Sequence, residues 1–187
     1  MKQLTLKGEF TLEGKGLHTG AHIAATFHPA PEDHGYKIQR TDVEGQPVID
    51  AVAENIVGTQ RGTVIGKGDV TVSTIEHAMA ALYACGIDNC LITLDGPEMP
   101  ILDGSAKPFF DCIQETGTVE QNADKDFFYV KHKIEVSNPE TGSKLILLPD
   151  DDFSVDVKVN FDSAVLANQY ATLDNVADFG EEVAWAR

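Results

Sequence analysis

The chain has 187 residues, of which 42% are hydrophobic and 24% charged, as in a globular protein of one large domain or two small ones. Asp and Glu number 30 against 14 Lys and Arg, and the resulting formal net charge of −16 argues against binding to nucleic acid or to an anionic membrane surface. No stretch reaches the roughly 20 apolar residues of a membrane span.

The N-terminus and the cysteines indicate the compartment. Residues 1–9 contain no continuous apolar run after the first lysine, so we do not expect a signal peptide there. The three cysteines, Cys85, Cys90 and Cys112, are an odd and sparse set, which is typical of a reducing compartment rather than of a disulfide scaffold. We therefore expect a cytoplasmic protein.

The first 75 residues read as short strands separated by turns. Apolar and polar residues alternate between breaks at Gly and Pro, a pattern that indicates half-buried strands. We expect these strands at residues 9–13, 23–27, 36–40, 58–65 and 70–72.

Two helices are expected next, with a buried strand over residues 89–94 between them. The first begins with Ser73-Thr74-Ile75-Glu76, which has the form of a capping box, with serine at the N-cap and glutamate at N3. The second has Ser105 as its N-cap, Pro108 in its first turn and Gly117 at its end.

The polar stretch 118–126 contains few apolar residues, and we interpret it as a linker between two units. Strands are expected after it over 127–136, 144–148 and 153–161, and a final helix near Asn175. About 60 residues with one helix just begun make a thin second domain, which suggests an interrupted fold.

Glu76 and His77 are the candidate residues for chemistry. Neighbouring residues are about 100° apart around a helix, so both side chains can reach one cleft at the helix start. The histidine can bind a metal ion, and the carboxylate can accept a proton from water. The alternative is structural: Glu76 caps its helix, and His77 is a surface or core histidine, since one histidine does not supply the three protein ligands of a metal site.

His18 lies between Gly16 and Gly20, and glycines allow a backbone to approach a ligand closely. The alternative is a plain turn between two strands that carries an exposed histidine. The sequence alone leaves both interpretations open.

Four motifs occur in this order along the chain: Gly16–Gly20 (GLHTG), Ser73–His77 (STIEH), Gly86–Asn89 (GIDN) and Gly96–Ala106 (GPEMPILDGSA). Together they resemble the zinc-dependent UDP-3-O-acyl-N-acetylglucosamine deacetylase family of lipid A biosynthesis, LpxC. The resemblance is strong over residues 1–117. It is weaker but collinear over 127–187.

The resemblance implies an α+β fold of two similar domains, each a sheet layered with helices, with the active site between them. The first domain would be 1–117, the linker 118–126 and a partial second domain 127–187. Glu76 would be the general base, His77 one zinc ligand, and His18 a residue close to the metal cleft. The substrate, a UDP-linked acylated amino sugar, would be contacted by the segment that contains Thr59, Gln60 and Arg61.

The remaining zinc ligands of the family, a His-x-x-x-Asp pair, are expected beyond residue 187. We therefore expect an N-terminal portion of the enzyme that is inactive alone and self-associates. Some family members are fused to a 3-hydroxyacyl-carrier-protein dehydratase, which would also follow this segment. The alternatives are a non-catalytic sugar-nucleotide binding module of the same fold and a protein-interaction domain.

The acidic composition fits poorly with a substrate that carries a diphosphate. Local positive charge would come from a few residues, such as Lys15, Arg40 or Arg61, or from sequence outside this chain.

Overall fold

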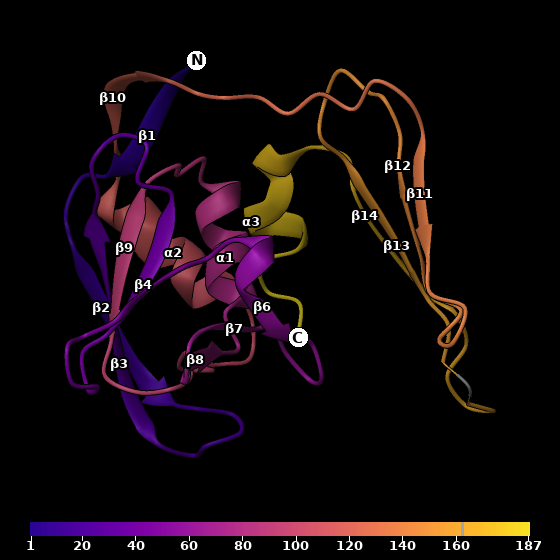
Figure 1. The fold of residues 1–187 in the computed structure, drawn as a ribbon. Coiled ribbons are helices and arrows are strands. Elements are labelled where there is room, and N and C mark those ends of the chain that lie inside the picture. The colour runs from indigo at the N-terminus through magenta and orange to yellow at the C-terminus, as the bar shows by residue number, and fades with distance from the viewer. Residues whose placement is uncertain (162) are drawn as a thin grey trace. The chain divides into compact units, whose positions relative to one another are not determined.

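The computed structural model describes residues 1–161 and 163–187, which divide into two compact units. One unit contains Met1–Lys125 and Phe179–Arg187, and the other contains Asp126–Asp178. Figure 1 shows helices together with several separate sheets, which confirms the α+β class. The expected division into two similar deacetylase domains stays a prediction.

The first unit is built on a mixed five-stranded sheet of order β2-β3-β9-β4-β5. Strand β9 is central, antiparallel to β3 and parallel to β4. Alternate residues of the central strands are buried, as a sheet with one face on the core requires. The strands are β2 (Phe10–Lys15), β3 (His22–Pro29), β4 (Tyr36–Arg40), β5 (Val48–Asp50) and β9 (Cys90–Leu94).

Helices α1 (Glu76–Ala84) and α2 (Lys107–Thr116) lie side by side next to this sheet (Figure 1). The core between them is apolar and closely packed. Phe27 of β3 stacks on Phe10 with ring centroids 4.7 Å apart and meets the edge of Phe109 of α2 at 6.0 Å. Helix α2 begins one residue later than a cap at Ser105 predicts, and it ends at Gly117 as predicted.

The segment predicted as a linker forms a strand for most of its length. Strand β10 (Thr118–Asp124) pairs antiparallel with β1 (Lys2–Leu6), a strand the sequence analysis also missed. Polar side chains attach β10 to the fold, because the Asn89 amide donates to Gln121 Oε1 at 2.8 Å and Gln121 donates to the Ala30 carbonyl at 3.0 Å. A strand held in this way lacks the apolar alternation that would predict it.

A three-stranded antiparallel sheet contains β6 (Ile56–Gly58), β7 (Val64–Lys67) and β8 (Val70–Ser73), and the short 3-10 helix η1 (Ala53–Asn55) precedes it. The prediction of one strand over 58–65 is therefore wrong. That segment turns back on itself, and residues 59–63 form the loop between β6 and β7.

The other unit contains two antiparallel hairpins. Strands β11 (Ile134–Ser137) and β12 (Lys144–Leu147) form one, and β13 (Val155–Val159) and β14 (Gln169–Leu173) form the other. The predicted strand 127–136 is real only in its last part.

The end of the chain turns into short helices. The 3-10 helix η2 (Val176–Asp178) belongs to the second unit, and helix α3 (Phe179–Glu182) belongs to the first. Within the first unit, Phe179 is buried with its ring 5.8 Å from that of Phe110 of α2. The helix predicted near Asn175 is therefore present, as a 3-10 turn followed by a single short α-helix.

We expect Asn89→Ala to lower the free energy of unfolding by at least about 2 kcal/mol, because each buried polar group left without a partner costs about 1–3 kcal/mol. Asn89 is 1% exposed, donates to Gln3 and Gln121, and accepts from the Gly35 amide. Urea unfolding measures the change. Asn122→Ala, on the exposed side of β10, is the matched control. Equal stability of the two variants would contradict this account of β10.

Candidate functional site

Glu76 is the first residue of α1, and it does not cap that helix. The N-cap position is Ile75, and no side chain caps the helix start, so the predicted capping box is wrong. Ser73 cannot cap because it is the last residue of β8, where its main chain is bonded to Pro97 and Met99. The Glu76 carboxylate is therefore free for another contact.

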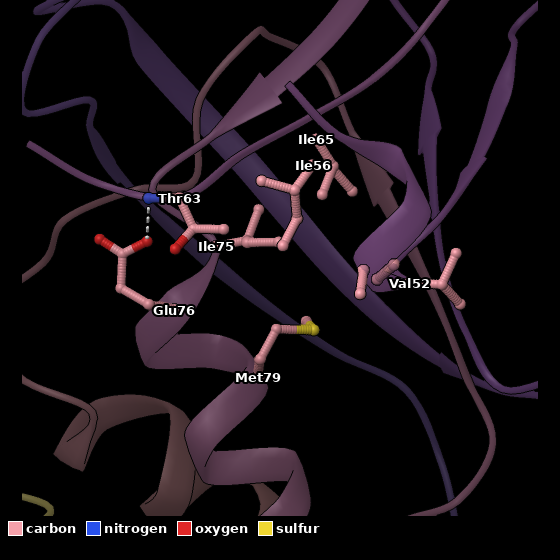
Figure 2. A pocket seen from close by; sticks show the side chains of 9 residues that line it. Val52, Ile56, Thr63, Ile65, Ile75, Glu76 and Met79 are labelled. Carbon is pink, nitrogen blue, oxygen red and sulfur yellow. Dashed lines mark hydrogen bonds between the residues drawn. The ribbon is translucent and has the colours of Figure 1, made fainter. Parts of the chain in front are cut away.

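That contact is the backbone of the β6–β7 loop. The Thr63 amide donates to Glu76 Oε2 at 2.9 Å, and Figure 2 shows this bond at the start of α1. Gly62 (φ 150°) permits the approach, because a Cβ there would lie 3.3 Å from Glu76 Oε1. The loop thus fixes one carboxylate oxygen and leaves the other without a bond to this segment.

A mainly apolar pocket of about 380 Å³ adjoins Glu76 (Figure 2). Glu76 contributes the one charged side chain of its lining. The other lining residues come from β5–η1, the small sheet and α1: Ala51, Val52, Ala53, Ile56, Thr63, Ile65, Ile75 and Met79.

The same loop reaches His18. The ring Nε2 of His18 lies 3.1 Å from the carbonyl oxygen of Arg61, two residues before the amide that holds Glu76. The exposed His18 ring and the Glu76 carboxylate, which are 58 positions apart in the sequence, are therefore linked to one five-residue loop. The structure brings these two predicted site residues and Arg61 together.

The other predicted site residues make fewer contacts with Glu76 and His18. His77 is half-buried beside Glu76 in the first turn of α1. Thr59, Gln60 and Arg61 are exposed in the β6–β7 loop. Within residues 1–161 and 163–187, neither Thr59 nor Gln60 has a hydrogen bond to the site residues, so proximity in the loop is all that the structure adds for them.

The described residues do not form a metal site by themselves. No group of three or more His, Cys, Asp and Glu residues among them could hold an ion. A catalytic zinc ion takes three protein ligands, whereas His77 provides one candidate. The described residues alone therefore do not provide the ligand set for the ion that the family resemblance implies.

Glu98 is a buried residue that the sequence analysis did not single out. Its side chain lies under the Gly16–Gly20 loop and accepts hydrogen bonds from it. Burial raises the pKa of this carboxyl. The hydrogen bonds from the backbone of His18 and Thr19, together with those from the Thr19 and Thr74 hydroxyls, lower the pKa by more than burial raises it, so the net pKa is below the ordinary value. Glu98 is therefore an anion at neutral pH.

One of the cations suggested for the substrate is already occupied. Arg40 is 7% exposed, and its guanidinium binds Asp42 at 2.8 Å and the Thr71 carbonyl at 2.6 Å. The hydrogen bond from Arg40 in turn lowers the pKa of Asp42. Lys15 and Arg61 remain exposed, so a diphosphate could reach these two but not Arg40.

In the described part of the chain, no helix has the length and apolar character needed to cross a membrane.

Comparison with known proteins identifies the family. The family model for UDP-3-O-acyl N-acetylglycosamine deacetylase, LpxC, matches residues 3–187. Across its whole length the chain is 61% identical to the bifunctional enzyme LpxC/FabZ of Porphyromonas gingivalis and 58% identical to that of Bacteroides thetaiotaomicron. It is 40% identical over 99% of its length to the UDP-3-O-acyl-N-acetylglucosamine deacetylase of Syntrophotalea carbinolica.

The chain belongs to the LpxC family, which confirms the resemblance carried by the four motifs. It spans 40% and 41% of the lengths of the two bifunctional relatives and 60% of the S. carbinolica deacetylase.

Proposed function

We propose that this chain is the N-terminal part of a zinc-dependent deacetylase, in which Glu76 is the general base. The substrate is a UDP-linked acylated N-acetylglucosamine of lipid A biosynthesis, and the products are acetate and the free amine. The observation that carries the proposal is the placement of Glu76: a carboxylate at a helix start, uncapped and held by one amide from the loop that contacts His18. Family membership supplies the reaction.

The chemistry asked of Glu76 is proton transfer. Hydrolysis of the acetamide forms a bond between a water oxygen and the carbonyl carbon, and it breaks the bond from that carbon to nitrogen. Glu76 accepts a proton from the attacking water, and the departing nitrogen gains one. General-base assistance of this kind contributes about 10²–10⁴-fold to the rate.

We propose zinc as the cofactor and His77 as one of its ligands. The support is the position of His77 next to Glu76 in the first turn of α1. The other ligands would come from sequence outside residues 1–187, since the described residues contribute no further set. Residues 1–187 alone would then be inactive.

Substrate contacts are proposed for His18, Thr59, Gln60 and Arg61. Three of these residues are exposed in the loop whose backbone holds Glu76, and His18 bonds to the same loop. Arg61 offers a free cation for the diphosphate in a strongly acidic chain. The arrangement would place the nucleotide beside the reacting acetamide.

We further propose a cytoplasmic enzyme of the bifunctional kind. Cys85, Cys90 and Cys112 are all free thiols, which persist in reducing compartments. Identity to the two bifunctional relatives, 61% and 58%, exceeds the 40% to the S. carbinolica deacetylase.

Glu76→Gln in the complete enzyme should lower kcat by about 10²–10⁴-fold, because the amide cannot accept the proton. Glutamine keeps an oxygen for the Thr63 amide, so the melting temperature and the bound zinc should not change. Steady-state kinetics, thermal unfolding and metal analysis measure the three quantities.

Glu115→Gln, which removes a charge from an exposed position of α2, is the control and should behave like the natural protein. Near-normal turnover of Glu76→Gln would refute the general-base role. Substrate binding with no turnover even in the natural protein would favour the non-catalytic sugar-nucleotide binding module.

His77→Ala in the complete enzyme should lower both zinc content and activity, since it removes one of three expected protein ligands. Metal analysis after dialysis is the decisive measurement. His34→Ala is the matched control, because the His34 ring contacts the backbone of its neighbour Gly35. Full zinc occupancy in His77→Ala would eliminate His77 as a ligand.

Residues 1–187 alone should bind no zinc at this site, show no deacetylase activity and self-associate. Many apolar side chains of the second unit are exposed, and exposed apolar patches and strand edges promote pairing between chains. Among them are Phe128, Tyr129, Val136, Leu145, Leu148, Val165 and Tyr170.

Sedimentation tests the association. Val136 and Leu145 face each other across β11 and β12 and are 59% and 62% exposed, so Leu145→Lys should shift the chain toward monomer. Asp151→Lys, a lysine introduced at an exposed polar position, is the control. A monomeric, zinc-loaded and active chain would overturn all three expectations.

A further inference from the structure

Glu98 is a charged side chain with no exposed surface, held among four hydrogen-bond donors. Its Oε1 accepts from the His18 amide and from Thr74 Oγ1, each at 3.0 Å. Its Oε2 accepts from the Thr19 amide at 2.9 Å and from Thr19 Oγ1 at 2.8 Å. An ion is costly to bury unless it is fully hydrogen-bonded, and Glu98 meets that condition.

Glu98 itself is held by the main chain on both sides. The Ser73 amide donates to the Pro97 carbonyl, and the Met99 amide donates to the Ser73 carbonyl, each at 3.0 Å. This short parallel bridge fixes Glu98 directly beside the end of β8. The carboxylate is therefore a fixed point from which other segments can be positioned.

The first of those segments is the loop that carries His18. A Cβ on Gly16 would lie 2.3 Å from Glu98 Oε2, so only glycine allows the loop to pass this close. Two consecutive amides, those of His18 and Thr19, then point at the carboxylate. The backbone of His18 is set by Glu98, while its ring contacts Arg61.

The second segment is the turn into α1. Thr74 has φ 58°, a conformation that is rare and strained for a β-branched residue. Its hydroxyl donates to Glu98, and this bond compensates for part of the strain. Thr74 comes two residues before Glu76, so its conformation determines where α1 starts and how Glu76 is presented.

We propose that Glu98 is a positioning residue of the deacetylase site, which holds His18 and Glu76 in a fixed relation through the Gly16–Gly20 loop and Thr74. The inference rests on the proposed function of Glu76. Glu98 touches neither of the two functional side chains. It acts through the backbone at His18 and through the hydroxyl of Thr74.

The test is Glu98→Gln in the complete enzyme, with kcat, KM and zinc content measured well below the melting temperature. The amide keeps the shape but turns one acceptor into a donor that faces a backbone N–H. A misplacement of about 1 Å can cost about 10²-fold in rate, so we expect kcat to fall by about 10–100-fold. KM and bound zinc should change far less.

A double-mutant comparison shows whether the loss passes through Glu76. If Glu98 positions the general base, Glu98→Gln should cause little further loss of kcat in a Glu76→Gln background. Additive losses, or unchanged kcat in Glu98→Gln, would overturn the proposal. Normal turnover of Glu76→Gln alone would instead overturn the proposed function, so the two failures are distinguishable.

Two variants of Thr74, to valine and to serine, test the same hydrogen bond if Glu98→Gln does not fold. Thr74→Val keeps the shape and loses the hydroxyl, and it should reproduce the fall in kcat. Thr74→Ser keeps the hydroxyl and should restore most of the turnover that Thr74→Val loses. Equal kcat values for the two variants would show that the bond to Glu98 has no part in positioning.

Discussion

The short parallel bridge between Ser73 and Glu98 is the contact on which the rest of the site depends. It joins the end of the small sheet to the connection that leads from β9 to α2. From this junction the chain turns through Thr74 into α1 on one side, and the buried carboxylate of Glu98 holds the His18 loop on the other. Three segments far apart in the sequence meet there, and the hydrogen bonds of the Glu98 carboxylate connect them.

The fold was predictable where apolar alternation carries it. Strand β4 has the predicted bounds, and β3 and β9 differ from the prediction by one or two residues at their ends. Strand β10 was missed because amide side chains such as Gln121 hold it in place, and an amide in a polar segment gives no periodic signal. The prediction of one strand over 58–65 misses the β6–β7 hairpin because the reversal lies at Arg61 and Gly62, and only the glycine signals it.

The sequence predicts which residues form the candidate site, but it does not predict the hydrogen bonds that connect them. Motifs single out Glu76, His77 and His18 as candidates, but nothing in the sequence indicates that the Arg61 carbonyl meets His18 or that the Thr63 amide meets Glu76. Both are backbone groups, which every residue type carries. The sequence does not single out Glu98 either. A glutamate between prolines in a loop is typical of an exposed surface, and the burial of Glu98 depends on Gly16, 82 positions earlier.

The capping box predicted at Ser73–Glu76 does not form. Ser73 and Glu76 satisfy the local rule for a capped helix, yet Ser73 is part of β8 and Glu76 accepts a hydrogen bond from the β6–β7 loop. An uncapped helix start costs about 1 kcal/mol. Near it lie two non-glycine residues with positive φ, Thr74 at 58° and Arg61 at 61°. Local rules are broken most often where function demands a particular geometry. Three such departures gather around the Glu76 carboxylate. The cap is absent because Ser73 is held in β8 by its hydrogen bonds to Pro97 and Met99, which leaves the Glu76 carboxylate to the Thr63 amide of the neighbouring loop.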